Sequence, residues 1–176
     1  KIRLPEGFAI ELLYSVPRDD QGSWVAMCQD DKGRFIVSDQ YGGLYRFPIP
    51  KAGETIDPAS IEQITYSPEG TPALKDIDAV AAKPLNDELA KLPRIGHAQG
   101  LCYAFDSLYV VVNARKSSTG SGVFRLLDTD GDDQFDTIKT IKALAATGGE
   151  HGPHAILPAP DGKHLYVVMG NQTALP

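Results

Sequence analysis

The feature that most constrains the fold is a unit of short strands that occurs three times along the chain. Each unit has an apolar run, a tight turn and then an alternating strand that ends in a small or polar residue. The units cover residues 24–47, 99–115 and 154–171, with turns at residues 31–33 and 160–162. A recurring unit of about four short antiparallel strands predicts the blades of an all-β propeller.

The bounds of the predicted blades follow from this repeat. We expect blade 1 at about residues 24–67, blade 2 at about 98–144 and the start of blade 3 at about 151–176. The run LNDELAKL predicts one short helix within an insertion at about residues 73–95. About two and a half blades do not close a ring of four to eight, so we expect the N-terminal portion of a longer protein. The alternative is a small separate β-sandwich, which fits the length but explains the repeat poorly.

Two arginines stand at the same position in the first two units. Residues 43–47 and 122–126 match as third strands, and these strands carry Arg46 and Arg125. Because charged side chains are seldom buried, we expect both arginines to be solvated, with a stacking or rim position as the alternative.

The connection after the third strand of blade 2 is strongly acidic. Its loop positions 1, 3, 5, 7 and 9 are Asp128, Asp130, Asp132, Gln134 and Asp136. Calcium takes about six to eight oxygens, and alternate positions of an acidic loop supply them. The run departs from the EF-hand, because Gly131 is at position 4 and Asp133 at position 6. It is more similar to the hairpin calcium loops of integrin-type propeller blades. We predict a calcium site here, with a solvated acidic turn as the alternative.

Imidazole and amide side chains cluster near the predicted inner strands of blades 2 and 3. They are His97, Gln99, His151, His154, Asn171 and Gln172. Loops that enter an inner strand lie at the central channel of a propeller, where ligands bind. Amides and imidazoles both donate and accept, which suits hydroxyl-rich or carbonyl ligands, and His151 or His154 suits a general base. The alternative is a turn whose histidines bond the backbone. Residues 39–43 of blade 1 are expected to form only a hairpin turn.

Several of these residues also carry a family resemblance. The run GEHGPHAILPAPDGKHLYVVMGNQ resembles a segment of soluble quinoprotein glucose dehydrogenases and sorbosone-dehydrogenase-like proteins. His151 lies ten residues before Asp161, and residues 170–172 read Gly-Asn-Gln where the family has Gly-Asp-Gln. AQGLCYAF resembles the family's sugar-contacting glutamine segment, which Gln99 matches. Nearly the whole chain is similar to large secreted bacterial propeller proteins described as membrane-bound or sorbosone-type dehydrogenases.

The resemblance implies a six-bladed propeller whose channel binds pyrroloquinoline quinone (PQQ). It implies His151 as the base that removes a hydroxyl proton, Gln99 as a substrate contact, and a sugar or aldehyde substrate. It also implies that calcium activates the cofactor. The acidic loop does not match that cofactor site, so its calcium is expected to be structural. A c-type haem module follows the propeller in many such proteins, but this chain has no Cys-x-x-Cys-His motif and is expected to hold no haem.

Three functions therefore stand as hypotheses. The first is a PQQ-dependent sugar or aldehyde dehydrogenase. The second is a non-catalytic, calcium-stabilised propeller that binds carbohydrate or protein. The third is a lactonase-like hydrolase.

Composition argues against two classes of partner. The formal net charge of −6 and the pI of about 5.1 argue against nucleic acid. The sequence contains no stretch of about 18 apolar residues, so it predicts no membrane-spanning helix.

The sequence from Lys1 onward does not have the charged and then apolar pattern of a signal peptide. We therefore expect a periplasmic or secreted chain whose signal peptide has been removed, with a cytosolic protein as the alternative. Cys28 and Cys102 lie in apolar runs and are expected to be buried free thiols.

Overall fold

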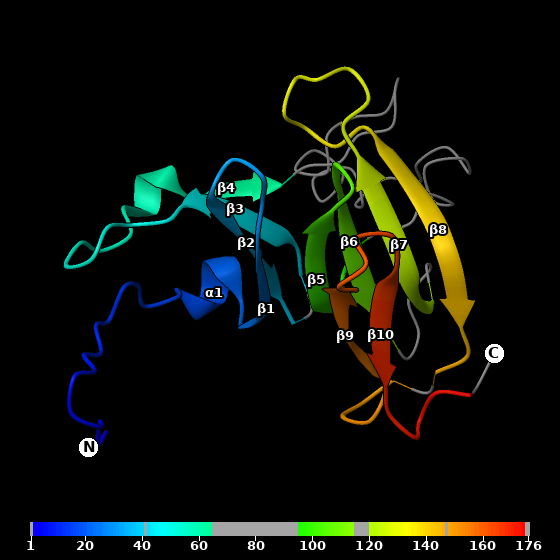
Figure 1. Ribbon diagram of the computed structural model, residues 1–176, viewed down its shortest axis with the longest axis horizontal. Helices are drawn as coiled ribbons and strands as arrows, with labels where there is room; N and C mark the ends of the chain where they lie inside the picture. The colour runs from blue at the N-terminus through cyan, green and yellow to red at the C-terminus, as the bar shows by residue number, and fades with distance from the viewer. Residues whose placement is uncertain (1, 41, 65–94, 115–119, 147, 175–176) are drawn as a thin grey trace.

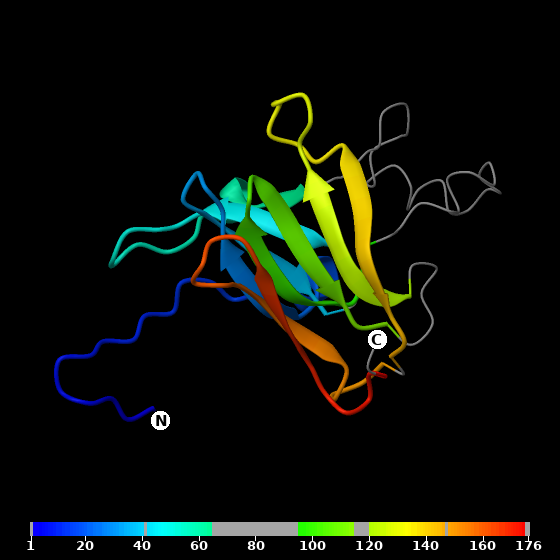
Figure 2. The ribbon, with the colours of Figure 1, turned by 45° about the vertical axis from the view of Figure 1, so that its right-hand side comes forward.

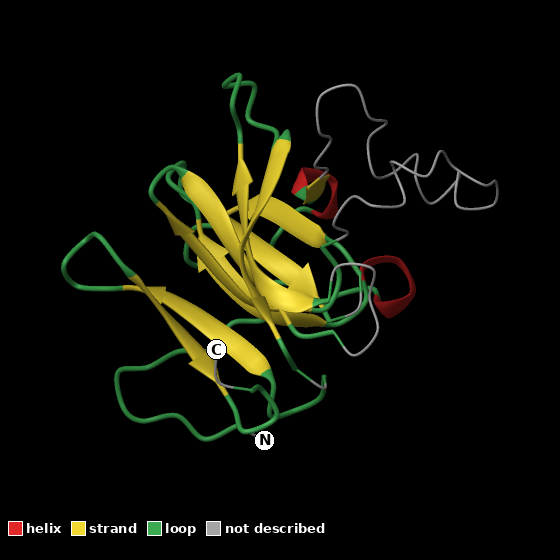
Figure 3. Cartoon of the chain, turned by 90° about the vertical axis from the view of Figure 1, so that its right-hand side faces the viewer, coloured by secondary structure: helices red, strands yellow, loops and turns green. Residues whose placement is uncertain are grey.

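The fold is all-β, and its strands form antiparallel sheets with little helix (Figure 1). The computed structural model describes residues 2–40, 42–64, 95–114, 120–146 and 148–174. The helix predicted within the insertion lies outside the described residues. The described helices are α1 (Arg18–Gln21) and the 3-10 turn η1 (Pro58–Ser60), which are small beside the strands (Figure 3).

The strands form two four-stranded sheets and one hairpin, each following chain order. The first sheet contains β1 (Trp24–Gln29), β2 (Arg34–Asp39), β3 (Leu44–Pro48) and β4 (Glu62–Ile64). The second sheet contains β5 (Ala98–Ala104), β6 (Ser107–Val112), β7 (Ser121–Leu127) and β8 (Thr137–Leu144). The hairpin contains β9 (Pro153–Pro158) and β10 (Leu165–Met169). These segments do not close a ring among the described residues.

The second sheet packs on the first sheet with one face and on the hairpin with the other (Figure 2). Its strand β6 is buried at every position, in the apolar sequence SLYVVV. Leu108, Val110 and Val112 pack against first-sheet residues such as Ile36. Tyr109 and Val111 pack against the hairpin through Ile156 and its neighbours. A strand with two covered faces is expected to be apolar throughout rather than alternating, which this strand is.

The first strands of the three units meet at the junctions between sheets. Strand β1 lies against β5, and β5 lies against β9. The β5–β9 approach is close at Gly100, where an added Cβ would overlap the carbonyl of His154. Glycine is therefore required where β5 and β9 come together.

Both thiols are free, as expected, although only Cys102 is fully buried and Cys28 is half-buried. Cys28 packs against the core between the first and second sheets, and burial raises the pKa of its thiol to about 12. A thiol with so high a pKa is a weak nucleophile at neutral pH.

Strands β1 and β10 expose apolar side chains to solvent on the faces that point away from the second sheet. On β1, Val25 and Met27 are 42% and 60% exposed, while Ala26 faces the second sheet. On β10, Tyr166 and Val168 are 59% and 55% exposed. Each of these strands therefore has an apolar outer face as well as an apolar inner one.

Removing the Leu108 side chain tests whether the second sheet anchors the stack. Leu108 is 0% exposed, so Leu108→Ala is expected to lower the free energy of unfolding by about 2–5 kcal/mol. The matched control is Leu157→Ala, since Leu157 is 56% exposed, and it is expected to change stability by less than about 0.5 kcal/mol. Denaturant unfolding measures both, and equal losses would contradict this packing.

Candidate functional site

The acidic loop connects β7 to β8 and folds around its own carboxylates. Ligand atoms of Asp128, Asp130 and Asp136 all lie within 4.8 Å of one another. The backbone N–H groups of Gly131 and Asp133 donate to the two oxygens of Asp128, at 2.7 and 2.9 Å. Three predicted calcium ligands are therefore brought together, with the oxygen chemistry that calcium prefers.

The other two predicted ligands lie outside this group. The carboxylate of Asp132 accepts a hydrogen bond from the backbone N–H of Gln134, at 2.8 Å. The side-chain amide of Gln134 donates to Glu62 of the first sheet, at 3.0 Å. The loop supplies a smaller set of side-chain oxygens than the spacing predicts, and calcium binding stays a prediction.

Asp136, the last residue of the loop, has one oxygen with hydrogen-bond partners and one without any among the described residues. Its Oδ2 accepts from both the backbone N–H and the hydroxyl of Thr129, each at 2.7 Å. The hydroxyl bond lowers the pKa of the Asp136 carboxyl. Its Oδ1 is buried and has no hydrogen-bond partner within the described residues.

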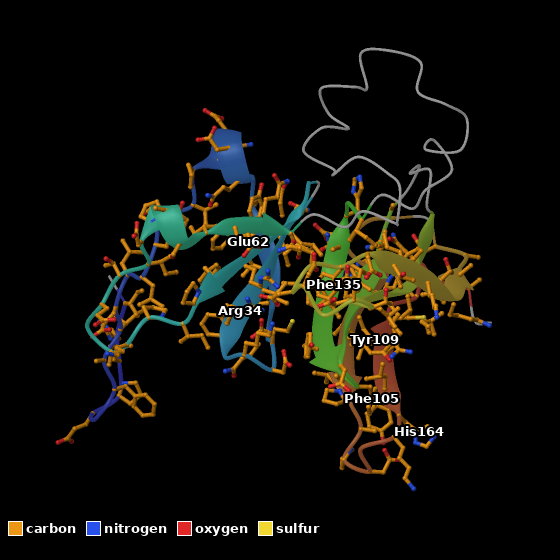
Figure 4. All side chains as sticks on the ribbon, turned by 90° about the horizontal axis from the view of Figure 1, so that it is seen from above. Arg34, Glu62, Phe105, Tyr109, Phe135 and His164 are labelled. Carbon is orange, nitrogen blue, oxygen red and sulfur yellow. The ribbon has the colours of Figure 1, made fainter. Side chains whose placement is uncertain are left out.

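Asp133, to which the sequence assigned no role, joins this loop to the first sheet. Its carboxylate accepts two hydrogen bonds from the Arg34 guanidinium, at 2.6 and 2.9 Å, and pairs with Lys32 Nζ at 2.7 Å. These bonds to Arg34 hold the pKa of Asp133 well below its usual range. Figure 4 shows this junction, with Arg34 and Glu62 on the first-sheet side and Phe135 on the second-sheet side.

The backbone explains why an aspartate occupies this point of the loop. Asp133 has a φ of 73°, in the left-handed region. This is loop position 6, where calcium loops usually place glycine. Aspartate is one of the few other residues that adopt this conformation readily.

The expectation that Arg46 is solvated is wrong. Its side chain is 4% exposed and donates to Glu62 at 2.8 Å and to the Asp133 carbonyl at 3.1 Å. A buried guanidinium is tolerated because its two terminal nitrogens meet anionic and carbonyl oxygens, while Nε has no partner within the described residues. Arg125 is half-buried, donates to Ser107 Oγ at 2.9 Å and lies 5.8 Å from the centre of the Tyr109 ring.

A second candidate site is a polar hollow of about 680 Å³ at one end of the sheets. Its wall comes from residues before or at the start of β5 and β9 and from residues that follow β2 and β6. They are Gln40, His97, Gln99, Asn113, Gly148, Gly149, Glu150 and His154. The hollow thus gathers polar groups from all three repeated units.

The structure brings together three of the six predicted binding residues. His97, Gln99 and His154 line the hollow. The side chains of His151, Asn171 and Gln172 are exposed and are not among its lining residues. The turn that carries His151 is fixed by a hydrogen bond from the Gln172 N–H to the His151 carbonyl, at 3.0 Å.

Two amide residues of the hollow had no predicted role. Gln40 belongs to residues 39–43, which were expected to form only a turn. Asn113 follows β6, is 7% exposed and donates from Nδ2 to the Gly149 carbonyl at 2.7 Å. Its Oδ1 has no hydrogen-bond partner within the described residues. The sequence does not predict a binding role for Gln40 or Asn113, because a single amide residue after a strand belongs to no recognisable motif.

His154 has a defined tautomer at this site. Its Nε2 hydrogen-bonds the carbonyl oxygen of Glu150. Because a carbonyl only accepts, Nε2 carries the proton, and Nδ1 of the neutral ring keeps its lone pair. His154 therefore has the proton-accepting atom that a general base needs.

The described wall of the hollow does not fit the quinone that the resemblance implies. PQQ is a tricarboxylate, which cationic side chains would bind. The described lining has the carboxyl of Glu150 and no lysine or arginine. The wall suits a neutral polar ligand better, and quinone binding rests on the resemblance alone.

No protein-family model, curated protein or solved structure matches the chain. The quinoprotein family therefore stays a prediction. Within the described residues, none of the helices is long and apolar enough to cross a membrane.

Replacing Asp133 with asparagine tests the junction through its pH dependence. Asparagine also tolerates a positive φ, so Asp133→Asn removes the charge and keeps the turn. We expect Tm at pH 7 to fall by about 2–4 °C. Because the folded pKa is lowered, the wild-type advantage is full above about pH 4 and disappears as the pH falls further.

Thermal unfolding between pH 7 and pH 2 measures this difference. The control is Asp19→Asn in the exposed helix α1, which is expected to leave Tm unchanged. A constant gap between wild type and Asp133→Asn at every pH would show that the carboxylate charge is not the cause.

Adding calcium to metal-free protein tests the acidic loop. An ion that binds only the folded state raises Tm by mass action, so we expect a rise at about 1 mM Ca²⁺. Asp130→Asn keeps an oxygen acceptor but removes a charge, and it is expected to weaken the effect. Mg²⁺ serves as the control cation because it demands a stricter octahedral geometry. An unchanged Tm with Ca²⁺ would favour a solvated turn.

Proposed function

We propose that the three sheets are successive blades of a β-propeller and that the hollow binds a neutral, hydroxyl-rich small molecule such as a sugar. The observation that carries the ligand proposal is the polar wall of the hollow, which combines amide, imidazole and carboxyl side chains. A second candidate function is oxidation of the bound hydroxyl group, with His154 as the base.

The repeated packing supports the propeller. Strand β1 contacts β5 and β5 contacts β9, so the first strand of each unit contacts the first strand of the next. The exposed apolar side chains on the outer faces of β1 and β10 are what further sheets of a ring would cover. In a ring of this kind, the ends of the inner strands gather around one channel.

The chemistry of the wall supports a hydroxyl-rich ligand. Gln99 and Asn113 offer amide donors and acceptors, and Glu150 adds an acidic residue. Ligand hydroxyls can pair with these donors and acceptors, whereas an apolar ligand would leave them without partners.

The observation that favours oxidation is the Nδ1 of His154, which has no hydrogen bond among the residues that the structure describes. A base at this atom would take the hydroxyl proton while hydride passes from the carbon to a two-electron acceptor, an added quinone or redox dye, which is reduced. His154 lines the hollow and His151 does not, so His154 is better placed for this role than the base that the resemblance implies.

Ligand titration tests the proposed binding. We expect aldoses or polyols to bind saturably by calorimetry, and Gln99→Ala to weaken binding about 2- to 10-fold, the value of one lost hydrogen bond. The matched control is Gln172→Ala, an exposed glutamine outside the hollow, which is expected to leave affinity unchanged. No saturable binding by any sugar or polyol would contradict the proposal.

Dye reduction, measured with and without added PQQ because the described wall does not fit this quinone, then separates oxidation from binding. His154→Gln is expected to abolish reduction and keep sugar affinity within about 10-fold, since at most one hydrogen bond changes. His151→Gln is expected to reduce dye normally. Binding without dye reduction in the wild type would leave a binding propeller and reject the dehydrogenase.

A further inference from the structure

One backbone hydrogen bond recurs at the strand ends of all three units. In each unit, the residue after the second strand donates its N–H to the carbonyl of the residue before the first strand. The donors and acceptors are Gln40 and Ser23 at 2.8 Å, Asn113 and His97 at 3.0 Å, and Gly170 and Gly152 at 3.0 Å. Asn113 therefore has the same place in the second unit as Gln40 in the first and Gly170 in the third.

The side chain of Asn113 extends this link to the next unit. Asn113 is 7% exposed, and its Nδ2 donates to the Gly149 carbonyl at 2.7 Å. Its amide also lies against Gly152, where an added Cβ would overlap it. With its backbone and its side chain, Asn113 thus contacts the residues that precede β5 and those that precede β9.

The turn at residues 149–152 is held by hydrogen bonds to each of its carbonyls. Asn113 is the donor to the first of them, at Gly149. The other donors belong to the third unit: they are His154 Nε2 to Glu150, the Gln172 N–H to His151 and the Gly170 N–H to Gly152. Asn113 is the member of this set that belongs to the second sheet, so it sets the place of the turn relative to that sheet.

The composition of the turn makes it dependent on such bonds. Gly148 and Gly149 have φ values of 70° and 109°. Glycine loses more conformational freedom on folding than any other residue, so bonds from outside are needed to select one conformation here. The carbonyl of Glu150, the next residue, holds the His154 ring. A shift of the turn would therefore also shift this ring.

We propose that Asn113 is a positioning residue of the hollow. Its amide holds the turn at residues 149–152 against the second sheet, and the Glu150 carbonyl in this turn then fixes the His154 ring with its proton on Nε2. The ring is thereby kept at a set spacing from Gln99 on the second sheet. This inference deepens the proposed function and rests on it.

Asn113→Asp tests this role with little change in shape. An ionised carboxylate donates no hydrogen bond, so it would face the Gly149 carbonyl as a second acceptor. Nitrogen-15 NMR of the histidine rings, in free protein at about pH 8, shows which ring nitrogen carries the proton. In the wild type we expect His154 to be protonated at Nε2 alone. In Asn113→Asp we expect its shifts to move toward those of the exposed His151 ring.

Two controls separate positioning from a general loss of structure. His164 Nδ1 hydrogen-bonds Asp161 at 2.6 Å at the opposite end of the hairpin, so its shifts are expected to stay the same in Asn113→Asp. Gln40→Glu makes the same amide-to-carboxylate change at the equivalent position of the first unit and is expected to leave His154 unchanged. Unchanged His154 shifts in Asn113→Asp would overturn the proposal. Equal changes at His154 and His164 would also overturn it, because Asn113 would then support the whole fold rather than this turn.

Gly152→Ala tests the same contact from the side of the turn. Its methyl group would push the turn away from the Asn113 amide, so we expect the His154 shifts to move as they do in Asn113→Asp. Adding Asn113→Ala gives the methyl group room, and the double variant is expected to lose less Tm than the sum of the single variants. Additive losses of Tm would contradict the contact on which the proposal depends.

Sugar titration keeps this inference distinct from the proposed ligand. We expect Asn113→Asp to weaken sugar affinity about 2- to 10-fold, because a displaced turn loses about one hydrogen bond to the ligand. Shifted His154 signals without any sugar binding by the wild type would reject the ligand and retain the positioning of the turn. Sugar binding by the wild type with unchanged His154 signals in Asn113→Asp would reject the positioning role and retain the ligand.

Discussion

The structure depends on a strand that must be covered on both faces. Every residue of β6 is buried, with Leu108, Val110 and Val112 turned to the first sheet and Tyr109 and Val111 turned to the hairpin. A single sheet would leave one apolar face of this strand in solvent, so the sheets stack. Stacking also brings the ends of β2, β5, β6 and β9 together, and this meeting of strand ends forms the polar hollow.

Apolar packing joins the first and second sheets in their interior, and ion pairs join them at the edge. Asp133 reaches from the second sheet to Arg34 and Arg46 on the first, where the Arg46 side chain is almost fully removed from water. Burying the Arg46 guanidinium is costly unless its hydrogen-bond partners are in place. The contacts with Asp133 therefore hold the two sheets together and also fix their relative position. The acidic loop thus has a structural role that does not require an ion.

The sequence predicted the strands well because their pattern is local. Alternating β-branched runs and the turns at residues 31–33 and 160–162 are read without knowing the fold. His97, Gln99 and His154 were found because the repeat places them at equivalent strand entrances. Asp133 was missed because its partner Arg34 is 99 residues away. The exposure of Arg46 was misjudged for the same reason, since burial depends on a distant partner. The orientation of His151 depends on how its turn packs, which residue spacing does not reveal.

The most direct test of the junction between sheets is a double-mutant cycle with Arg46→Gln and Asp133→Asn, followed by denaturant unfolding. If the two side chains stabilise one interface together, the loss in the double mutant falls short of the sum of the single losses. The expected coupling is about 0.5–3 kcal/mol at pH 7, fading below about pH 4, where Asp133 of the unfolded chain takes up a proton while the folded carboxylate stays ionised. Additive losses at pH 7 would mean that the two residues act independently and that this ion pair does not hold the sheets together.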